Sequence, residues 1–388
     1  KGTVYRFDGV DDSIVATTPA EALNIFDGGG TISSWIYPKS DGEGSEGRIL
    51  DKRSGSGWTF FCQTDDGTNL SLKLHVDFSV LGGDWTTAVV VPLDTWSHVA
   101  LTYNADSVSN DAIFYLNGIP LATTTATTPQ GTRVSDSASD FMIGQVTGGT
   151  RTFDGEIAHA QLDNFLRTAA EVKDLISGNI PFKWQGASQT ELIADVNDRT
   201  FAAASNWVDD SMDSYSEATN AQVVSSTASG QTVTLATGNA PMTTGKRYRL
   251  TYDASSLSGD GFEIRDAGNS RLDISNDLYI FIAGTQVEHE FTYKGASGGL
   301  RIYSVGTGAI TIDNYTLVAL GAVALYTQDS ISETTWFDKS SNSNDGAVTG
   351  ASVLNDDIPA YLENTYNPTV VCSTSGSYVL TASRDTLS

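Results

Sequence analysis

Residues 31–37 read Thr31-Ile32-Ser33-Ser34-Trp35-Ile36-Tyr37, and this stretch decides the fold. Its β-branched and aromatic side chains alternate with small polar ones, which is typical of a β-strand with one face in a core. Clusters of Gly, Asn and Asp, which predict turns, separate it from six more stretches of this kind before residue 92: residues 4–7, 13–15, 48–50, 58–61, 70–74 and 88–91. The sequence therefore predicts an all-β fold of tandem antiparallel β-sandwiches.

The strand pattern continues towards residue 180 and ends in the one helix that the sequence predicts clearly. Residues 96–103 and 155–165 have strand patterns, and Asn117-Gly118 predicts a two-residue hairpin turn. Thr168 followed by Glu171 forms the capping-box pattern of a helix N-terminus. We expect a first domain over residues 1–180.

The length and charge of the chain limit its organisation and its partners. A chain of 388 residues is expected to hold two or three domains of about 100–200 residues each. A formal net charge of −25 with only 22 Lys and Arg predicts repulsion from phosphate backbones, so we expect no nucleic-acid partner. No apolar run approaches the ~20 residues of a membrane helix, so we expect no membrane insertion. Because the sequence begins at Lys1 without Met, we expect a window from a longer protein.

Five landmarks of the first domain resemble those of the laminin-G-like, concanavalin A-like jelly roll. In chain order they are Phe7 to Ile14, Thr31 to Pro38, Trp96 to Tyr103, Phe114 to Gly118, and Gly155 to Phe165 with the capped helix. The resemblance implies two curved antiparallel sheets, with ligands on the concave face or at the loop rim. Lectins, adhesion modules and glycosidases share this fold, so the fold alone does not choose among them.

A linker is expected over residues 181–200 and a second strand-rich domain over residues 201–321. Gly245-Lys246-Arg247-Tyr248 enters one of its predicted strands, and Ile312-Asp313-Asn314-Tyr315 lies in the last one. These two motifs resemble carbohydrate-binding modules of the galactose-binding-like type. The resemblance implies a second β-sandwich.

Residues 322–388 form a third, β-rich segment, which we expect to continue into a further domain. Trp336 to Gly346 resembles a Trp/Asp and Ser-Gly-Asn-rich loop common in bacteriophage fibre and virion proteins. Residues 366–371 and 373–380 look like the start of a phage tail-fibre segment. This resemblance implies a place on the virion surface, other virion proteins and host-surface glycans as partners, and a homo-oligomer, a trimer by analogy with fibre proteins.

Patterns of catalytic sites are scarce. A jelly-roll glycosidase needs two carboxylates roughly 5–10 Å apart, usually from alternate positions of one strand. Among the glutamates only Glu288-His289-Glu290 has this spacing, and a solvated strand face explains it better. Residues 295–299 match the nucleophile-elbow pattern but join two predicted antiparallel strands, where we expect a hairpin turn. We therefore predict that the protein is not an enzyme.

Calcium is the metal ion that the sequence favours, because acidic oxygen ligands are plentiful and the four histidines lack zinc spacing. Asp8, Asp11 and Asp12 form the best cluster. The jelly-roll resemblance implies that Asp163 joins them if the first and last strands pair. Asp313 is the corresponding candidate in the second domain. The alternative is that these aspartates are ordinary turn residues.

Sugar binding requires aromatic platforms beside polar side chains. Trp58, Trp85 and Trp207 stand next to Gly, Asp or Asn at the edges of strand segments, which favours exposed rings that stack on carbohydrate. Trp35 and Trp96 alternate with apolar neighbours and are expected in the core. A Trp at a strand end more often covers a core than binds a ligand, so this alternative stays open for all three candidates.

Two hypotheses about function remain. The first is a non-catalytic structural and adhesive component of a phage particle, of the tail-fibre or head-fibre type, that displays glycan-binding sandwiches. The second is a secreted, extracellular bacterial protein whose glycan-binding modules accompany a glycoside hydrolase. Display and surface binding are favoured over catalysis in both.

Overall fold

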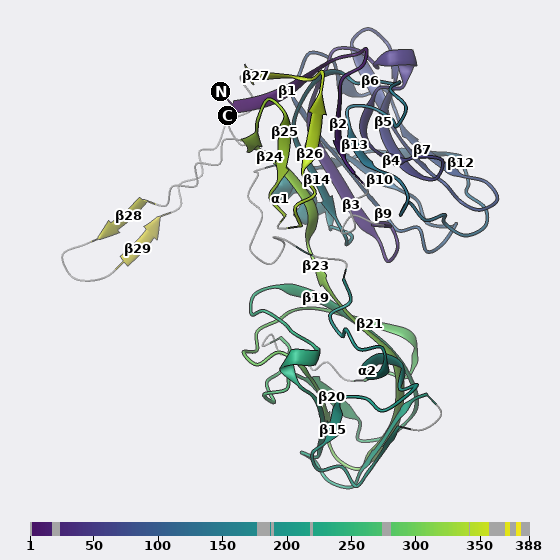
Figure 1. The fold of residues 1–388 in the computed structure, drawn as a ribbon, viewed down its shortest axis with the longest axis vertical. Coiled ribbons are helices and arrows are strands. Elements are labelled where there is room, and N and C mark those ends of the chain that lie inside the picture. Colours follow the sequence, from purple (N-terminus) through teal and green to yellow (C-terminus); the bar gives the residue numbers. More distant parts are fainter. Residues whose placement is uncertain are drawn as a thin grey trace.

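The computed structural model describes residues 2–17, 24–176, 187, 190–217, 220–273, 281–340 and 342–356, with the backbone of residues 369–372 and 378–381. Nearly all regular structure in these residues is β-strand in antiparallel pairs, which confirms the predicted all-β fold. Figure 1 shows two strand-rich bodies, one with β1 to β14 and β24 to β27 and one with β15 to β23. We call them the first and the second sandwich.

One layer of the first sandwich is built around β14 (Asp154–Asp163). This strand pairs with β1 (Gly2–Asp8) on one side and with β3 (Gly30–Pro38) on the other. The layer continues through β9 (Ser97–Tyr103), β10 (Ile113–Leu116) and β11 (Ile119–Pro120). The stretch of residues 31–37 thus lies in an inner strand, which explains why nearly all of β3 is buried.

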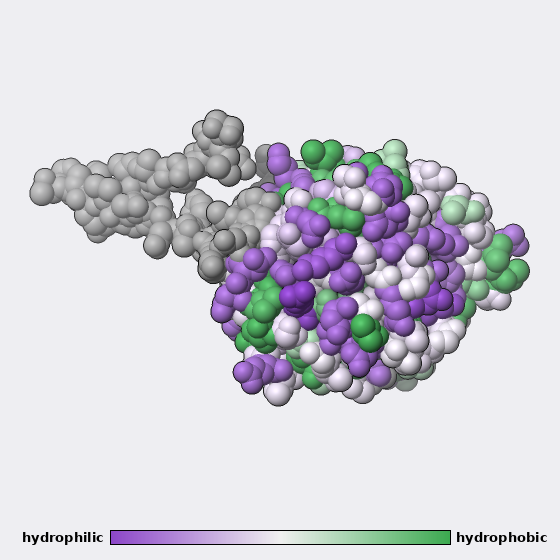
Figure 2. Space-filling model, turned by 90° about the horizontal axis from the view of Figure 1, so that it is seen from above, coloured by the Kyte–Doolittle hydropathy of each residue, from purple (hydrophilic) through white to green (hydrophobic). Residues whose placement is uncertain are grey.

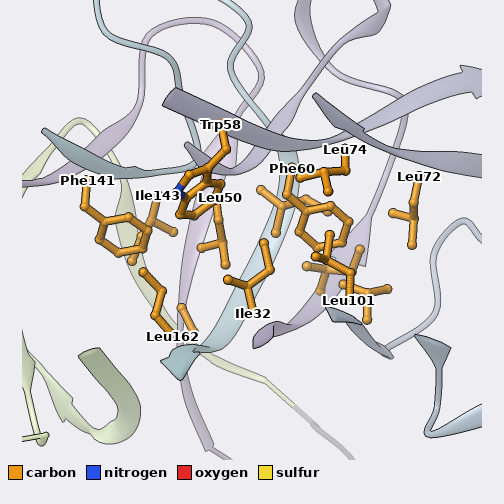
Figure 3. Packing of buried hydrophobic residues seen from close by; sticks show 14 of the residues in the cluster. Ile32, Leu50, Trp58, Phe60, Leu72, Leu74, Leu101, Phe141, Ile143 and Leu162 are labelled. Atoms are coloured by element: carbon orange, nitrogen blue, oxygen red, sulfur yellow. The ribbon is translucent and has the colours of Figure 1, made fainter. Parts of the chain in front are cut away.

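The other layer runs in the order β2 (Ser13–Ala16), β13 (Phe141–Ile143), β4 (Arg48–Arg53), β5 (Gly57–Asp65), β6 (Asn69–Val76), β7 (Gly83–Thr87) and β12 (Thr123–Thr127). The short strand β8 (Val91–Pro92) also pairs with β6, and a 3-10 helix (Glu43–Ser45) precedes β4. Figure 3 shows Leu50, Phe60 and Leu74 of this layer facing Ile32 and Leu101 of the other. All five are fully buried, so one hydrophobic core lies between the layers.

The predicted helix is present as α1 (Ala169–Leu175). Thr168 accepts a hydrogen bond from the backbone of Glu171, whose carboxylate accepts one from the backbone of Thr168, so the capping box is confirmed. Val172 and Leu175 are buried, and Val172 packs with Ala100 on the outer face of the first layer. The helix therefore covers part of this layer from outside.

Four strands of residues 322–356 join the first sandwich, three of them by pairing with earlier strands and β25 by pairing with β24 and β26. They are β24 (Ala322–Ile331), β25 (Thr335–Asp338), β26 (Gly346–Thr349) and β27 (Ser352–Asp356). β24 pairs with β14, β26 with β2, and β27 with β1. The sequence sets residues 322–388 apart as a segment of their own, whereas residues 322–356 of this segment belong to the first sandwich. Strand patterns predict where strands lie but not which distant strand pairs with which.

The loop that resembles a phage motif holds these strands in place. Backbone N–H groups of Leu325 and Asn344 donate to the carboxylate of Asp338 at 2.9 and 3.0 Å. The Asn344 side chain donates to the backbone oxygen of Val323 at 3.0 Å, and Trp336 is fully buried against Tyr5 of β1, with ring centroids 5.1 Å apart. The Trp, Asp and Asn of this motif therefore contribute contacts that hold the closing strands in place.

The second sandwich also has two layers. One contains β15 (Trp207–Asp209), β18 (Thr232–Leu235), β22 (Leu300–Ser304) and β20 (Phe262–Arg265), in that order. The other contains β16 (Ser214–Glu217), β17 (Gln222–Ser226), β23 (Gly308–Leu320), β19 (Arg247–Gly259) and β21 (Gly284–Thr292). A single cluster of buried apolar side chains from both layers forms its core, and short helical turns lie at Asn197–Thr200 (α2) and Thr237–Asn239.

The two sandwiches are joined where β23 passes into β24 at Gly321. Asn164 at the end of β14 donates its side-chain amide to the oxygen of Ala319 and accepts from the N–H of Gly321, both at 2.9 Å. Of the predicted linker, residues 181–186, 188 and 189 lie outside the described residues. Ala187 belongs to the core of the first sandwich and Ile193 to that of the second.

Two further findings concern the C-terminal segment and the expected lack of membrane insertion. The backbone of β28 (Thr369–Cys372) pairs with that of β29 (Tyr378–Thr381) as a separate hairpin (Figure 1). Among the described residues, no helix has the length and apolar character that crossing a membrane requires.

Replacement of Trp336 by alanine tests whether the closing strands stabilise the first sandwich. W336A should lower the free energy of unfolding by about 3–5 kcal/mol, because it leaves a cavity against Tyr5 and Tyr326. Phe337, the next residue, is 46% exposed, so F337A should change stability by about 0.5 kcal/mol or less. Denaturant unfolding measures both, and equal effects of the two substitutions would contradict the observed pairing.

Candidate functional site

The first sandwich contains a cavity of about 610 Å³ between the ends of β9 and β10 and the start of α1. Its polar lining comes from the loop that joins β9 to β10, with Asn104, Ser109, Asn110 and Asp111. Figure 2 shows one end of the molecule, where hydrophobic side chains form separate spots among hydrophilic ones. This cavity is therefore the candidate site for a ligand.

Asp111 is held in position by two donors from β7 and β12 of the other layer. The indole N–H of Trp85 donates to its Oδ1 at 2.9 Å, and the hydroxyl of Thr125 donates to the same oxygen at 2.6 Å. Trp85 is fully buried and lies against Tyr103, with ring centroids 4.6 Å apart. The other carboxylate oxygen of Asp111 has no hydrogen-bond partner among the described residues, so it can accept from a ligand.

Two asparagines beside Asp111 are oriented by the loop backbone. The side-chain amide of Asn110 donates to the backbone oxygen of Asn104 at 3.0 Å, and the Asn104 side-chain oxygen accepts from the N–H of Asp106 at 2.8 Å. These bonds use one end of each side-chain amide. The Asn104 amide nitrogen and the Asn110 amide oxygen remain for a ligand, one as a donor and one as an acceptor.

An apolar wall completes the cavity. Ile113 of β10 is 46% exposed and Leu166, just before α1, is 44% exposed. Tyr115 also lines the cavity and is buried against Ala100 and Val172. Exposed apolar side chains beside oriented amides and a carboxylate suit a ligand that carries both C–H faces and hydroxyl groups.

Burial also affects a phenol in the lining. Tyr103 is almost fully buried, and burial raises the pKa of its hydroxyl, with a further increase from the nearby carboxylates Asp111 and Asp106. The hydroxyl has no hydrogen-bond partner among the described residues. Tyr103 therefore remains a neutral phenol at physiological pH.

The three tryptophans proposed as stacking platforms are not exposed. Trp58 and Trp85 are fully buried, and Figure 3 shows Trp58 beside Leu50 and Phe141 in the core. Trp207 is 5% exposed and stacks on Tyr315 in the core of the second sandwich, with ring centroids 5.3 Å apart. The prediction of exposure is wrong because the pairing of each strand decides which of its two faces lies against the core, and this face carries all three rings, whatever polar residues flank them. Trp85 nevertheless reaches the site through its hydrogen bond to Asp111.

The acidic loop between β1 and β2 does bring three aspartates together. Ligand atoms of Asp8, Asp11 and Asp12 lie within 4.8 Å of one another. Asp12 is buried, and burial, together with the charges of Asp8 and Asp11, raises the pKa of its carboxyl. A Cβ on Gly350 would lie 2.1 Å from an Asp12 oxygen, so the chain packs closely around this carboxylate. The donor set fits a calcium ion that takes its remaining ligands from backbone and water.

Asp163 does not join this cluster. β1 and β14 do pair, but in a register that places Asp154 opposite Asp8, with Asp163 at the far end of β14. There Asp163 is buried and forms an ion pair with Arg167, with Oδ2 2.6 Å from the guanidinium Nε. Antiparallel pairing places the end of β1 beside the start of β14, so Asp163 at the other end of β14 lies away from the loop.

Asp313 lies opposite Asp253 in the pairing of β23 with β19, beside a second cavity of about 550 Å³. Burial and the charge of Asp253 raise the pKa of the Asp313 carboxyl. Asp253 accepts from the Asn314 side chain at 2.7 Å and from the Gln286 N–H at 2.6 Å, and these bonds lower its pKa. Among the described lining residues only these two carboxylates are present, and both already accept hydrogen bonds, so the donor set for a cation is sparse.

The glutamate pair singled out in the sequence is neutralised by arginines. Glu290 on β21 lies 2.7 Å from Arg247 and 2.9 Å from Arg249, and Glu288 lies 3.3 Å from Arg249. Residues 295–299 connect β21 to β22, which belong to different layers, so this segment is a crossover between layers and not the expected hairpin turn. The glutamates are therefore engaged in ion pairs, and residues 295–299 lead into a strand and not into the helix that a nucleophile elbow requires.

The histidines are structural as well. Burial lowers the pKa of His98 to about 3 and that of His159 to about 4, so both are neutral. His75 lies between Asp84 and Asp77, at 2.7 and 3.1 Å. None of these three, nor His289, belongs to a cluster of three or more metal-ligating groups in the part of the chain that the structure describes.

A carboxylate pair that the sequence does not reveal lies on the outer face of the first layer. Glu156 of β14 is 7% exposed, and burial together with Asp356 of β27 raises the pKa of its carboxyl to about 7. The indole N–H of Trp96 donates to Asp356 Oδ2 at 3.1 Å. Because the two residues are far apart in the sequence, no local motif predicts the pair. Glu156 itself is buried, so we assign the pair to the attachment of β27.

A family model described as the concanavalin A-like lectin/glucanases superfamily matches residues 8–173. These residues form a concanavalin A-like domain. The match agrees with the two-layer architecture and with the resemblance noted in the sequence. No curated protein sequence matches the chain.

Solved structures similar to this chain include lectin-like and carbohydrate-binding proteins. A heptameric SAP-like pentraxin from Limulus polyphemus is 15% identical over 44% of this chain and 80% of that chain, with a TM-score of 0.35. A putative carbohydrate-binding protein from Bacteroides ovatus is 18% identical over 44% and 46%, with a TM-score of 0.31. The CBM40 of the Ruminococcus gnavus IT-sialidase is 15% identical over 39% and 84%, also with a TM-score of 0.31. Likeness at this level concerns only the fold of part of the chain.

The assignment of Glu156 to the attachment of β27 predicts a pH-dependent effect of E156Q. In the folded protein Glu156 keeps its proton up to about pH 7, so its contribution to stability is present at acidic pH and is lost as the pH rises through 7. Glutamine carries no such charge. The free energy of unfolding of E156Q minus that of the wild type should therefore increase from pH 5 to pH 8, by up to about 3 kcal/mol.

Thermal unfolding at the two pH values measures this gain. E333Q is the matched control on an exposed side chain and should change stability by about 0.5 kcal/mol or less at either pH. A gain by E156Q that is the same at both pH values would contradict the pairing with Asp356.

Proposed function

We propose that this protein is a non-catalytic glycan-binding protein and that the cavity between β9, β10 and α1 holds the sugar. The observation that supports this most is the lining itself. A carboxylate fixed from behind by Trp85 stands beside two oriented amides and an exposed apolar wall. Hydroxyl groups pair with the polar side chains, and the C–H face of a sugar ring suits the apolar wall.

We propose binding without catalysis because of the arrangement of the acidic groups. In the lining of the cavity, as far as the structure describes it, Asp111 is the only carboxylate, whereas glycoside hydrolysis needs two flanking the bond. Elsewhere, Glu288 and Glu290 form ion pairs with arginines, and Glu156 is buried. Binding without cleavage is therefore the activity that the site supports.

The setting of this binding remains a proposal drawn from the sequence. We propose display on a phage virion surface, next to other virion proteins and in a homotrimer, with a secreted bacterial glycan-binding protein as the alternative. The Trp336 to Gly346 motif packs and forms hydrogen bonds within the first sandwich, so its residue pattern has a structural explanation that requires no phage setting. The other phage-like segments fall largely outside the described residues. A trimeric mass of the purified chain would support the first setting, and a monomer the second.

Three variants test the binding site. N110A removes an amide from the cavity, and W85F keeps a buried aromatic ring but removes the donor that orients Asp111. Each should weaken binding to the best neutral oligosaccharide from a glycan array about tenfold, because one hydrogen bond is worth about 1.4 kcal/mol here. N220A makes the same change as N110A in the cavity of the second sandwich and should leave the affinity unchanged.

Isothermal titration measures the three affinities, and circular dichroism checks that each variant is folded. If N220A weakens binding and N110A does not, the sugar binds to the second sandwich and the assigned site is wrong. If the wild type binds no glycan on the array, glycan binding itself is wrong.

We also propose that Asp8, Asp11 and Asp12 hold a structural calcium ion. At a concentration about a hundred times its dissociation constant, Ca²⁺ should raise the melting temperature of the wild type by about 5–10 °C relative to EDTA. D11N should abolish this rise, because Asp11 is exposed and its carboxylate is not needed for the loop hydrogen bonds that Asp8 and Asp12 make. D66N, at another exposed acidic turn, should respond to Ca²⁺ as the wild type does, and a rise that survives in D11N would place the ion elsewhere.

A further inference from the structure

The candidate sugar cavity exposes a negative charge that no neighbouring cation balances. Asp111 forms no ion pair with a lysine or arginine in the described part of the chain. Its Oδ1 accepts only from neutral donors, the indole of Trp85 and the hydroxyl of Thr125. Both donors stabilise the ionised carboxylate without cancelling its charge.

The one cationic residue in the described lining is already paired. Arg167 is 4% exposed, and its guanidinium contacts both carboxylate oxygens of Asp163, at 2.6 and 3.1 Å. It also lies over the ring of Phe165, 4.8 Å from the ring centroid. A ligand in the cavity would have to break this buried pair to reach the charge, which is costly.

The surroundings of the cavity add negative charge. Asp106, in the same loop, is exposed and accepts from the N–H of Gly28 with both oxygens. Glu171 of α1 lies 4.0 Å from Arg247, so that cation too has acidic partners. The exposed Lys173 of α1 packs beside Gly118 of the β10–β11 turn, outside the cavity lining.

We propose, on the basis of the glycan-binding function proposed above, that the ligand of this cavity is a neutral glycan and that Asp111 determines this specificity. Its free carboxylate oxygen accepts hydrogen bonds from sugar hydroxyls, while the Asn104 amide donates to a neighbouring sugar oxygen. The same carboxylate repels the carboxylate, sulfate or phosphate groups of acidic glycans. Ile113 and Leu166 contact the uncharged C–H or methyl groups of the sugar.

The distance between Asp111 and a charged group of the ligand determines how strongly acidic glycans are disfavoured. A ligand anion about 4–5 Å from Asp111 at a half-exposed site should be disfavoured about tenfold or more. The net charge of −25 adds a longer-range repulsion that slows the approach of acidic polymers at low ionic strength. Both effects weaken when salt is added, the long-range one more strongly.

The test compares one neutral oligosaccharide, the best binder on an array, with its derivative oxidised to a carboxylate at C6. Titration of the wild type should show at least about tenfold weaker binding of the acidic derivative at low salt. D111N keeps the side-chain shape and an oxygen for Trp85, so it should fold. It should bind the neutral sugar less tightly and bring the two affinities within about threefold of each other.

D106N is the matched control, because it removes the same charge from the same loop without touching the cavity lining. It should preserve most of the discrimination. Equal binding of the two sugars by the wild type, or an equal loss of discrimination in D106N and D111N, would overturn the role of Asp111 while leaving glycan binding intact. A wild type that binds no glycan would overturn the proposed function, and this inference with it.

Discussion

The first sandwich is held closed by hydrogen bonds between strands from opposite ends of the described chain. β27 pairs with β1 and β26 with β2, and Trp336 packs against Tyr5 where they meet. Strands with one apolar face and an unpaired edge are unstable in water and prone to association. The closing strands cover these edges. They also connect the first sandwich to the second, since β23 continues through Gly321 into β24. Asn164 forms hydrogen bonds with Ala319 and Gly321 at this junction.

The candidate site depends on the core that this closure protects. Trp85 lies in the core between the layers, yet its indole N–H reaches Asp111 in the wall of the cavity. The carboxylate is therefore oriented by a side chain that the ligand never touches. Such an arrangement lowers the entropic cost of binding, because the carboxylate is already ordered before the ligand binds. It also makes the site sensitive to changes in the core of the sandwich.

Local features of the chain could be predicted from the sequence and long-range ones could not. Alternation correctly predicts β3 around Trp35, and the spacing of Thr168 and Glu171 predicts the capped helix. The grouping of Asp8, Asp11 and Asp12 also follows from one short loop. Other features depend on which strands meet and in which direction and register. They are the burial of Trp58, Trp85 and Trp207, the distance of Asp163 from that loop, and the pairing of Glu156 with Asp356. The cavity cannot be predicted for the same reason: Asn104, Ser109, Asn110 and Asp111 have the sequence of an ordinary polar loop, and only the fold brings Ile113 and Leu166 beside it.

The central claim is that the cavity between β9, β10 and α1 of the concanavalin A-like domain binds a sugar. A crystal structure of the chain with a bound neutral oligosaccharide tests it most directly. The account predicts a sugar ring with hydroxyl groups within hydrogen-bond distance of Asp111 and Asn110 and its C–H face against Ile113. A sugar bound instead in the cavity beside Asp253 and Asp313, or on the outer face of β5 and β6, would contradict it.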